Sequence, residues 1–144
     1  MTGRDVALLA ATQVGIRENP PNSNNVRYNT WYYGREVSGS AYPWCMVFVQ
    51  WVFAQVGVAL PQRTASCGSL MRAAQKSGEW VTADYRPGDV VIYDFPGGAA
   101  TDHCGIVESV TDSGVVAIEG NPGPGSDADG GQVQRRSRAF SVNV

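Results

Sequence analysis

The chain of 144 residues contains a single histidine, His103, and only three cysteines, Cys45, Cys67 and Cys104. Any chemistry that pairs a thiol with an imidazole must therefore use His103, and a metal site that needs two histidines from one chain is excluded. No two cysteines have the CxxC spacing of typical zinc sites, so we expect no structural zinc. An odd number of cysteines also leaves at least one thiol unpaired.

Long apolar runs and a strong charge of one sign are also missing. No stretch approaches the ~20 apolar residues that a membrane-spanning helix needs. The N-terminal MTGRDVALLAATQVG lacks the apolar core and the cleavage site of a signal peptide. A net charge of −2 and a pI near 5.3 give no sign of a nucleic-acid partner. We therefore expect no membrane segment and no nucleic acid. If the protein acts outside the cytoplasm, another device or a leader absent from this chain must carry it there.

What the chain does contain is typical of one globular domain over residues 1–144, because 43% of the residues are hydrophobic and 17% are charged. The first part, to about residue 78, has helical patterns. The expected helices are an apolar-periodic segment from Val6 to Val14, the aromatic-rich NVRYNTWYYG, the run Cys45–Val56, and a segment from Ser66 or Cys67 to Lys76. Gly57 and Gly78 are placed to end the last two helices, and Ser66 or Thr64 can cap the fourth.

The second part, about residues 79–144, has the patterns of β-strands. Residues 86–89, RPGD, form an expected turn before VVIYDF, and HCGIVESV and VVAIEGN are two strands joined by residues 111–114. The closing QVQRRSRAFSVNV can supply one or two more strands, and we interpret its arginines, Arg135, Arg136 and Arg138, as a solvated edge strand. Helices followed by antiparallel strands indicate an α+β fold.

Cys45 and His103 have positions that suit chemistry. Cys45 opens a predicted helix, with Pro43 in its first turn, and the unpaired N–H groups and dipole of a helix N-terminus favour a thiolate. The same N–H groups could hold the oxyanion that forms when a carbonyl is attacked. Glu119 and Asn121, two residues apart, share one face of a strand and can both point toward His103 on a neighbouring strand. A carboxylate or amide there would fix the ring through Nδ1–H and leave Nε2 to face the thiol.

Four segments in this order, YPWCMVFVQWVF, RPGDVVIYDF, DHCGIVESV and AIEGN, make the chain resemble the CHAP family of cysteine- and histidine-dependent amidohydrolases and peptidases. The resemblance covers nearly the whole chain. It implies a papain-like fold in which N-terminal helices pack on a C-terminal antiparallel half-barrel sheet. It also implies cleavage of amide bonds in bacterial peptidoglycan, as in many phage lysins, by a phage-encoded or exported enzyme. By position, Cys45 is the expected nucleophile, His103 the base, Glu119 the orienting residue and Asn121 a further polar site.

Some members of that family carry an aspartate-rich calcium loop before the nucleophile. The corresponding segment here, YNTWYYGREVSGSAYPW, contains no aspartate, so we expect no calcium there. Asp127 and Asp129 lie in a glycine-rich loop that we do not interpret as a metal site. We therefore expect no metal and no cofactor.

Several assignments stay open from the sequence. Cys67 also lies near a helix start and is a rival to Cys45, and a Cys67–Cys104 disulfide would satisfy the odd count. Cys104, next to His103, is expected to face the core. Substrate contacts are expected from three aromatic residues, Trp44 as the wall of the cleft with Tyr42 and Trp31 beside it.

The function also has alternatives. The leading hypothesis is a monomeric peptidoglycan hydrolase that acts as an amidase between muramic acid and the stem peptide, or as an endopeptidase within the peptides. A second hypothesis keeps the chemistry but moves it to a small or non-wall amide. A third is a non-catalytic wall-binding module that retains the fold.

Overall fold

The structure, a computed structural model, describes residues 2–21, 23–39, 41–93, 103–120 and 131–140. Within these residues, helices come first in the chain and an antiparallel sheet follows, which confirms the predicted α+β class. The helices are α1 (Gly3–Thr12), α2 (Arg27–Tyr33), α3 (Cys45–Val56) and α4 (Cys67–Ser77). The strands are β1 (Val90–Tyr93), β2 (His103–Val110), β3 (Gly114–Glu119) and β4 (Gln134–Ala139).

The two helices that begin with cysteines end as the sequence predicts. Gly57 and Gly78 follow α3 and α4 with φ of 80° and 81°, the left-handed conformation that glycine adopts without a steric penalty. The Ser66 hydroxyl caps α4 by accepting a hydrogen bond from the backbone N–H of Ser69. One detail was wrong: Trp44 is the N-cap of α3, so Pro43 precedes the helix instead of lying in its first turn. None of the described helices is long and apolar enough to cross a membrane.

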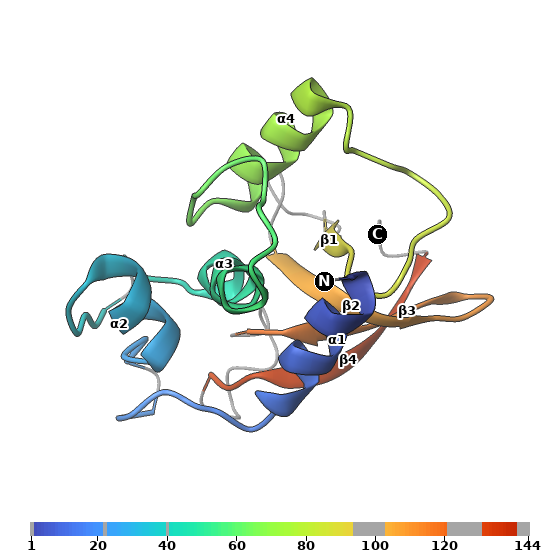
Figure 1. Ribbon diagram of the computed structural model, residues 1–144. Coiled ribbons are helices and arrows are strands. Elements are labelled where there is room, and N and C mark those ends of the chain that lie inside the picture. The colour runs from blue at the N-terminus through green and yellow to red at the C-terminus, as the bar shows by residue number, and fades with distance from the viewer. Residues whose placement is uncertain (1, 22, 40, 94–102, 121–130, 141–144) are drawn as a thin grey trace.

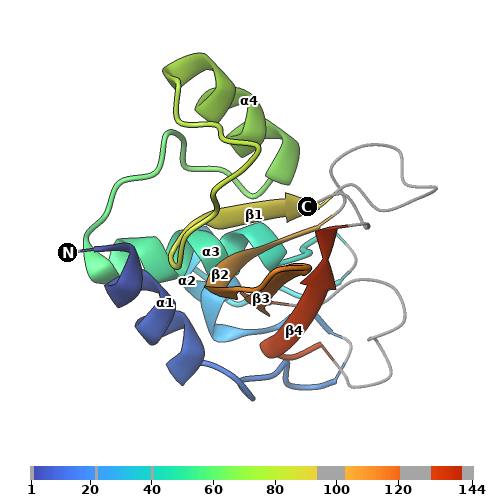
Figure 2. The same cartoon turned by 90° about the vertical axis from the view of Figure 1, so that its right-hand side faces the viewer.

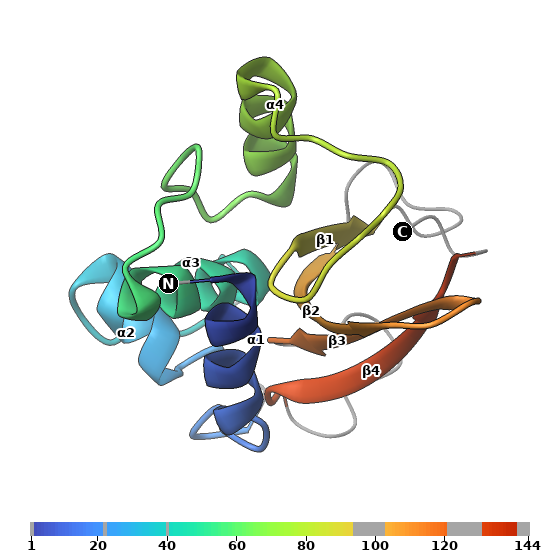
Figure 3. The ribbon, with the colours of Figure 1, turned by 45° about the vertical axis from the view of Figure 1, so that its right-hand side comes forward.

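The sheet has the strand order β1-β2-β3-β4, and every neighbouring pair is antiparallel. Figure 1 shows α3 between α2 and the strands, with α4 standing apart from the other helices. The turned view in Figure 3 shows α1 and α3 beside the sheet, and Figure 2 shows α4 standing near the β1 edge. N-terminal helices thus pack on a C-terminal sheet, as expected of a papain-like fold.

The two faces of the sheet bury different sets of side chains. Toward the helices, Cys104, Ile106 and Ile118 join the main hydrophobic core with the apolar side chains of α3. On the opposite face a smaller cluster is built from the side chains of Val91, Tyr93, Val107, Val115 and Ala117. Because side chains alternate along β2, Cys104 belongs to the helix face and His103 to the other. The prediction that Cys104 faces the core is confirmed, since it is fully buried there.

Candidate active site

Cys45 is the first residue of α3, at the end of the helix where backbone N–H groups lack intrahelical partners. The following residues are almost all buried, including Met46, Val47 and Phe48, so the helix is held firmly in the core. Cys45 itself is only partly buried. The strongly apolar run that follows the cysteine thus anchors the helix, and Cys45 lies at its only partly buried end.

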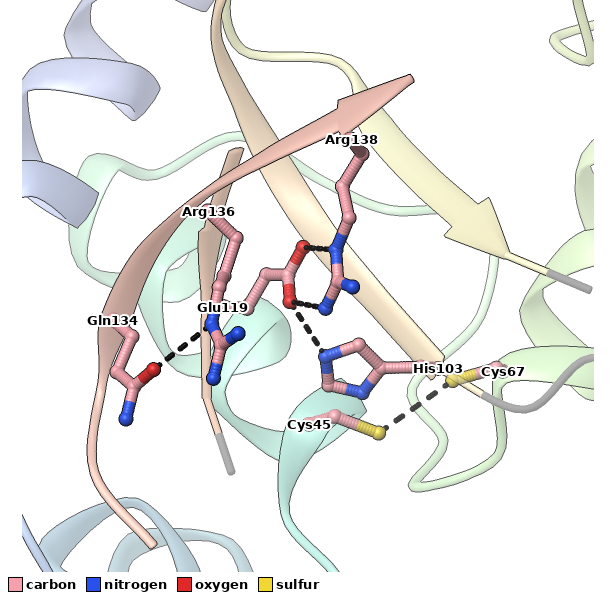
Figure 4. A network of polar contacts seen from close by, with 7 residues as sticks. All are labelled: Cys45, Cys67, His103, Glu119, Gln134, Arg136 and Arg138. Carbon is pink, nitrogen blue, oxygen red and sulfur yellow. Dashed lines mark hydrogen bonds and ion pairs between the residues drawn. The ribbon is translucent and has the colours of Figure 1, made fainter. Parts of the chain in front are cut away.

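His103, the first residue of β2, is 2% exposed and contacts groups on both sides of its ring. Its Nε2 lies 2.9 Å from Oε1 of Glu119. The other side of the ring faces the Cys45 thiol, and Figure 4 shows the second ring nitrogen toward the cysteine. The expected ring orientation was therefore wrong: Nε2 meets the carboxylate and Nδ1 faces the thiol. The alternation of side chains along a strand sets the face of the ring, but not the torsion that decides which nitrogen points where.

Glu119 ends β3 and is fully buried. Besides His103, its carboxylate is held by the guanidinium of Arg138, which donates from Nε to Oε2 at 2.9 Å and from Nη2 to Oε1. Paired hydrogen bonds of this kind fix a carboxylate in orientation as well as in charge. Tyr93 stacks on His103 with the ring centroids 5.9 Å apart, and the Arg138 guanidinium lies over the Tyr93 ring at 5.1 Å.

Gly105 leaves the space through which Glu119 reaches His103. The β2–β3 register pairs Ile106 with Ile118, so Gly105 is opposite Glu119, and His103 lies two residues farther along the same face. A Cβ on Gly105 would lie 2.7 Å from Cγ of Glu119 and 3.0 Å from the backbone oxygen of Ile118. The carboxylate side chain therefore passes directly over the glycine, in space that any side chain would occupy.

The charges of this site favour a thiolate beside an imidazolium. Hydrogen bonds from Cys104 and Cys67, together with His103, lower the pKa of Cys45 well below its usual value despite burial. Burial opposes protonation of His103, but its hydrogen bonds with Cys45 and Glu119 prevail and raise its pKa to about 9. Burial likewise opposes ionisation of Glu119, yet the hydrogen bonds from Arg138 and His103 lower its pKa. Near neutral pH this arrangement supplies a nucleophilic sulfur and a proton donor in contact.

The other two cysteines lie beside the nucleophile candidate as neutral thiols. The Cys67 sulfur is 3.7 Å from the Cys45 sulfur. A hydrogen bond with Cys104 favours the Cys67 thiolate, but its contact with Cys45 and its burial prevail and raise its pKa. Burial and contacts with the other two thiols raise the pKa of Cys104 well above its usual value. All three cysteines are free, so the Cys67–Cys104 bridge that the sequence left open is not formed. These directions favour Cys45 over its rival Cys67.

The structure treats the remaining expected site residues differently. Asn121 lies outside the described residues, as do Asp127 and Asp129, and its expected role stays a prediction. Trp44 cannot form a cleft wall and that expectation was wrong, because the side chain is fully buried. Its indole Nε1 donates to Oε2 of the buried Glu18 at 2.8 Å, and its ring stacks on Tyr28. Trp44 packs inward because its indole N–H finds a polar partner inside the core.

Tyr42 and Trp31 are both partly buried. Tyr42 lies three residues before Cys45, and its ring packs edge-on against Tyr33. Trp31 lines a hollow of about 250 Å³ together with Phe53 and Ala54, in the C-terminal half of α3 and not at its cysteine end. A role in substrate binding stays a prediction for both residues, and the position of Tyr42 supports it better.

A larger cavity, of about 490 Å³, lies between the α4 region and β1. Leu70, Trp80, Tyr85 and Val90 are among the residues that line it, whereas Cys45, His103 and Glu119 are not. Size alone would favour this cavity as the binding site. The candidate site remains at Cys45, because a thiol, an imidazole and a carboxylate meet there.

Two features of the site escaped the sequence analysis. The arginines of β4 were interpreted as a solvated edge, and this holds for Arg135, which is exposed and pairs with Glu108. It is wrong for Arg138, whose side chain is only 18% exposed and holds Glu119. The second feature is the meeting of all three thiols, from two helix starts and one strand. Alternation along β4 could have placed Arg138 on the same face as Arg136, but no sequence pattern signals the cysteine cluster.

Comparison with known proteins agrees with this geometry. No curated protein and no solved structure matched the chain. The model of the CHAP domain family matches residues 37–121, which include Cys45, His103 and Glu119. CHAP domains form a family of cysteine- and histidine-dependent amidohydrolases. The match therefore supports, in general terms, a function of the peptidoglycan hydrolase or amidase type. Because the match extends over more than half of the sequence, the chain belongs to the CHAP domain family.

Proposed function

We propose that the protein hydrolyses an amide bond of bacterial peptidoglycan, with Cys45 as nucleophile and His103 as acid and base. The observation that carries this proposal is the contact of the Cys45 thiol with an imidazole whose opposite nitrogen is held by a buried carboxylate. The CHAP domain supports the cell wall as the place of action. This constellation is that of a cysteine hydrolase, because thiol, imidazole and orienting group have the geometric roles of a catalytic triad.

The first half of the reaction forms a thioester. The Cys45 thiolate attacks the amide carbonyl, and the N–H groups at the start of α3 stabilise the oxyanion. His103, protonated because its pKa is raised, donates the Nδ1 proton to the leaving amine. The amine departs with that proton, and the acyl group stays on the sulfur.

The second half releases the acyl group. Neutral His103 takes a proton from a water molecule, which attacks the thioester carbonyl and forms the carboxylic acid product. The thiolate and the imidazolium are restored. Throughout, Glu119 keeps the ring oriented and stabilises its charged form, while Arg138 keeps Glu119 ionised and in place. Asn121 and Tyr42 are proposed to contact the substrate.

Two kinds of bond fit this chemistry, the one between muramic acid and the stem peptide and those within the peptides. Mass spectrometry of fragments released from purified peptidoglycan separates them. An amidase frees the amino group of the first stem residue and leaves a carboxylate on muramic acid, whereas an endopeptidase creates new amino and carboxyl termini inside the peptides. The variant Cys45→Ala is the control for contaminating hydrolases. If the wild type releases no fragment that Cys45→Ala does not also release, the proposal is wrong and a wall-binding module is favoured. Hydrolysis of a panel of small amides is measured in parallel and tests the alternative of a non-wall substrate.

A further inference from the structure

The three cysteines of this chain meet at one point, although they come from three different elements. Cys45 begins α3, Cys67 begins α4, and Cys104 lies on the helix face of β2. Their sulfur atoms all lie within 4.8 Å of one another, and Cys45 and Cys67 are 3.7 Å apart. Figure 4 shows the Cys67 sulfur directed at that of Cys45. A hydrolase needs one nucleophilic thiol. The other two lower the pKa of Cys45, but the proposed reaction has neither of them bond to the substrate.

The spacing of the sulfurs suits a metal ion that prefers thiolates. Zinc binds cysteine sulfur at about 2.3 Å with tetrahedral geometry, which places two ligating sulfurs about 3.8 Å apart. The Cys45–Cys67 separation of 3.7 Å is already close to this value. Since no pair exceeds 4.8 Å, Cys104 needs to approach by about 1 Å at most.

The surroundings also suit such an ion. Cys104 is fully buried and Cys67 is 7% exposed, so both are held by packing and need little further ordering to bind. Cys45 is partly buried and gives an ion access from the outside. Soft thiolate ligands select zinc, cadmium or cuprous ions over calcium and magnesium, which prefer oxygen.

We propose that Cys45, Cys67 and Cys104 form a binding site for one thiophilic d¹⁰ metal ion, such as Zn²⁺ or Cd²⁺, and that the bound ion blocks Cys45. The blocking part depends on the proposed function, since it assumes that Cys45 is the nucleophile. The site is inhibitory, because the ion takes up the sulfur that must attack the substrate.

The binding test uses Cd²⁺ and the full chain, reduced with a phosphine and kept free of oxygen so that no disulfide forms. Titration with Cd²⁺ is followed by the ultraviolet charge-transfer absorption of cadmium–thiolate bonds. We expect saturation at one ion per chain. Cys67→Ala and Cys104→Ala should each lower the absorption per ion, and should weaken binding by on the order of 100-fold or more, because each removes a direct ligand. Asp112→Asn, which removes an exposed carboxylate, is the matched control and should bind as the wild type does.

The outcomes separate the parts of the proposal. Equal absorption and affinity in the wild type and in Cys67→Ala would overturn the three-thiol site. If Cys104→Ala does not fold, judged by its circular dichroism, Cys104→Ser replaces it in the same comparison. Hydrolysis of a wall preparation is measured in parallel, and we expect Zn²⁺ to abolish it and EDTA to restore it. Full hydrolysis by the metal-loaded chain would overturn the blocking part. A metal-free chain that hydrolyses nothing would refute the proposed function, while the Cd²⁺ titration would still decide the site.

Discussion

Gly105→Ala adds one methyl group and changes none of the residues to which we assign chemistry, yet it should impair the site. The new Cβ would lie 2.7 Å from Cγ of Glu119, whereas ordinary contacts begin at 3.4 Å. The glutamate must therefore retreat by about 0.7 Å, or β2 must move by a similar amount. Because Gly105 and His103 both belong to β2, a Glu119 side chain that moves away from Gly105 also moves away from His103.

The size of the effect follows from the contact between His103 and Glu119. Moving away from β2 by that amount would stretch the Nε2–Oε1 distance from 2.9 Å to about 3.6 Å, beyond the usual hydrogen-bonding range. A misplacement of ~1 Å at a catalytic group can cost about 10²-fold in rate. We expect turnover to fall roughly 10- to 100-fold. Overpacking itself should cost about 1–3 kcal/mol of unfolding free energy and lower the melting temperature by several degrees.

The assay exploits the single histidine of the chain. Once any affinity tag that contains histidine is removed, the imidazole signals in an NMR titration belong to His103 alone. The pKa of His103, raised to about 9 in the wild type, should fall in Gly105→Ala because the contact with Glu119 is one of its causes. Val107→Ile is the matched control: it overpacks the same face of the same strand, away from Glu119, and should keep both the turnover and the pKa of the wild type.

Two results would refute this reasoning. The first is a Gly105→Ala variant with wild-type turnover and an unchanged His103 pKa, which would mean that the glutamate can reach the ring by another path. The second is an equal loss of turnover in Val107→Ile. The damage would then come from general overpacking and not from the displaced carboxylate.

Further predictions concern the same chain of contacts. Arg138→Gln should lower turnover by about 10- to 100-fold, because it removes the partner that holds Glu119, whereas Arg135→Gln on the exposed side of the same strand should change it less than about twofold. In pH–rate profiles, kcat/KM should decline as the pH rises through about 9, where His103 loses its proton, and Glu119→Gln should move this decline to lower pH, because the carboxylate no longer stabilises the imidazolium. The comparable change in a serine-protease triad costs ~10⁴ in turnover, which sets the upper limit for Glu119→Gln. Brief treatment with iodoacetamide near neutral pH should label Cys45 first, as peptide mapping can show, and preferential labelling of another cysteine would contradict its assignment. EDTA should not reduce activity, and a loss that calcium or zinc restores would contradict the expectation that the protein requires no metal.

Much of the fold could be predicted because the chain marks the ends of its elements with local chemistry. Gly57 and Gly78 stop two helices in the left-handed conformation, and Ser66 caps the second of them. The strand HCGIVESV was predicted with its observed bounds, since β-branched residues and a following turn delimit it. These signals act over a few residues, so they can be interpreted without knowledge of the tertiary structure.

The parts of the site that could not be predicted depend on how elements pack across the fold. That Trp44 points inward depends on Glu18, a buried carboxylate far away in the sequence that accepts its N–H. The role of Arg138 depends on a side chain long enough to reach from β4 to the end of β3, which a cluster of arginines does not reveal. The cysteine cluster depends on tertiary packing that places the first residue of α4 beside the first residue of α3. Periodicity and caps describe each element by itself and contain no information about these contacts between elements.

The charges of the site alternate from one residue to the next, and this alternation accounts for its burial. Arg138 is positive, Glu119 negative, His103 positive and the Cys45 thiolate negative, each in contact with the next. Removing one partner of a buried ion pair costs about 3–5 kcal/mol, because an uncompensated charge remains. Because the four groups are in contact in series, loss of Arg138 should also affect Cys45: Glu119 would be less ionised, and His103 would in turn be less basic. Arg138, on a strand at the end of the sheet order, thereby contributes through Glu119 and His103 to the conditions under which the Cys45 thiol is a thiolate.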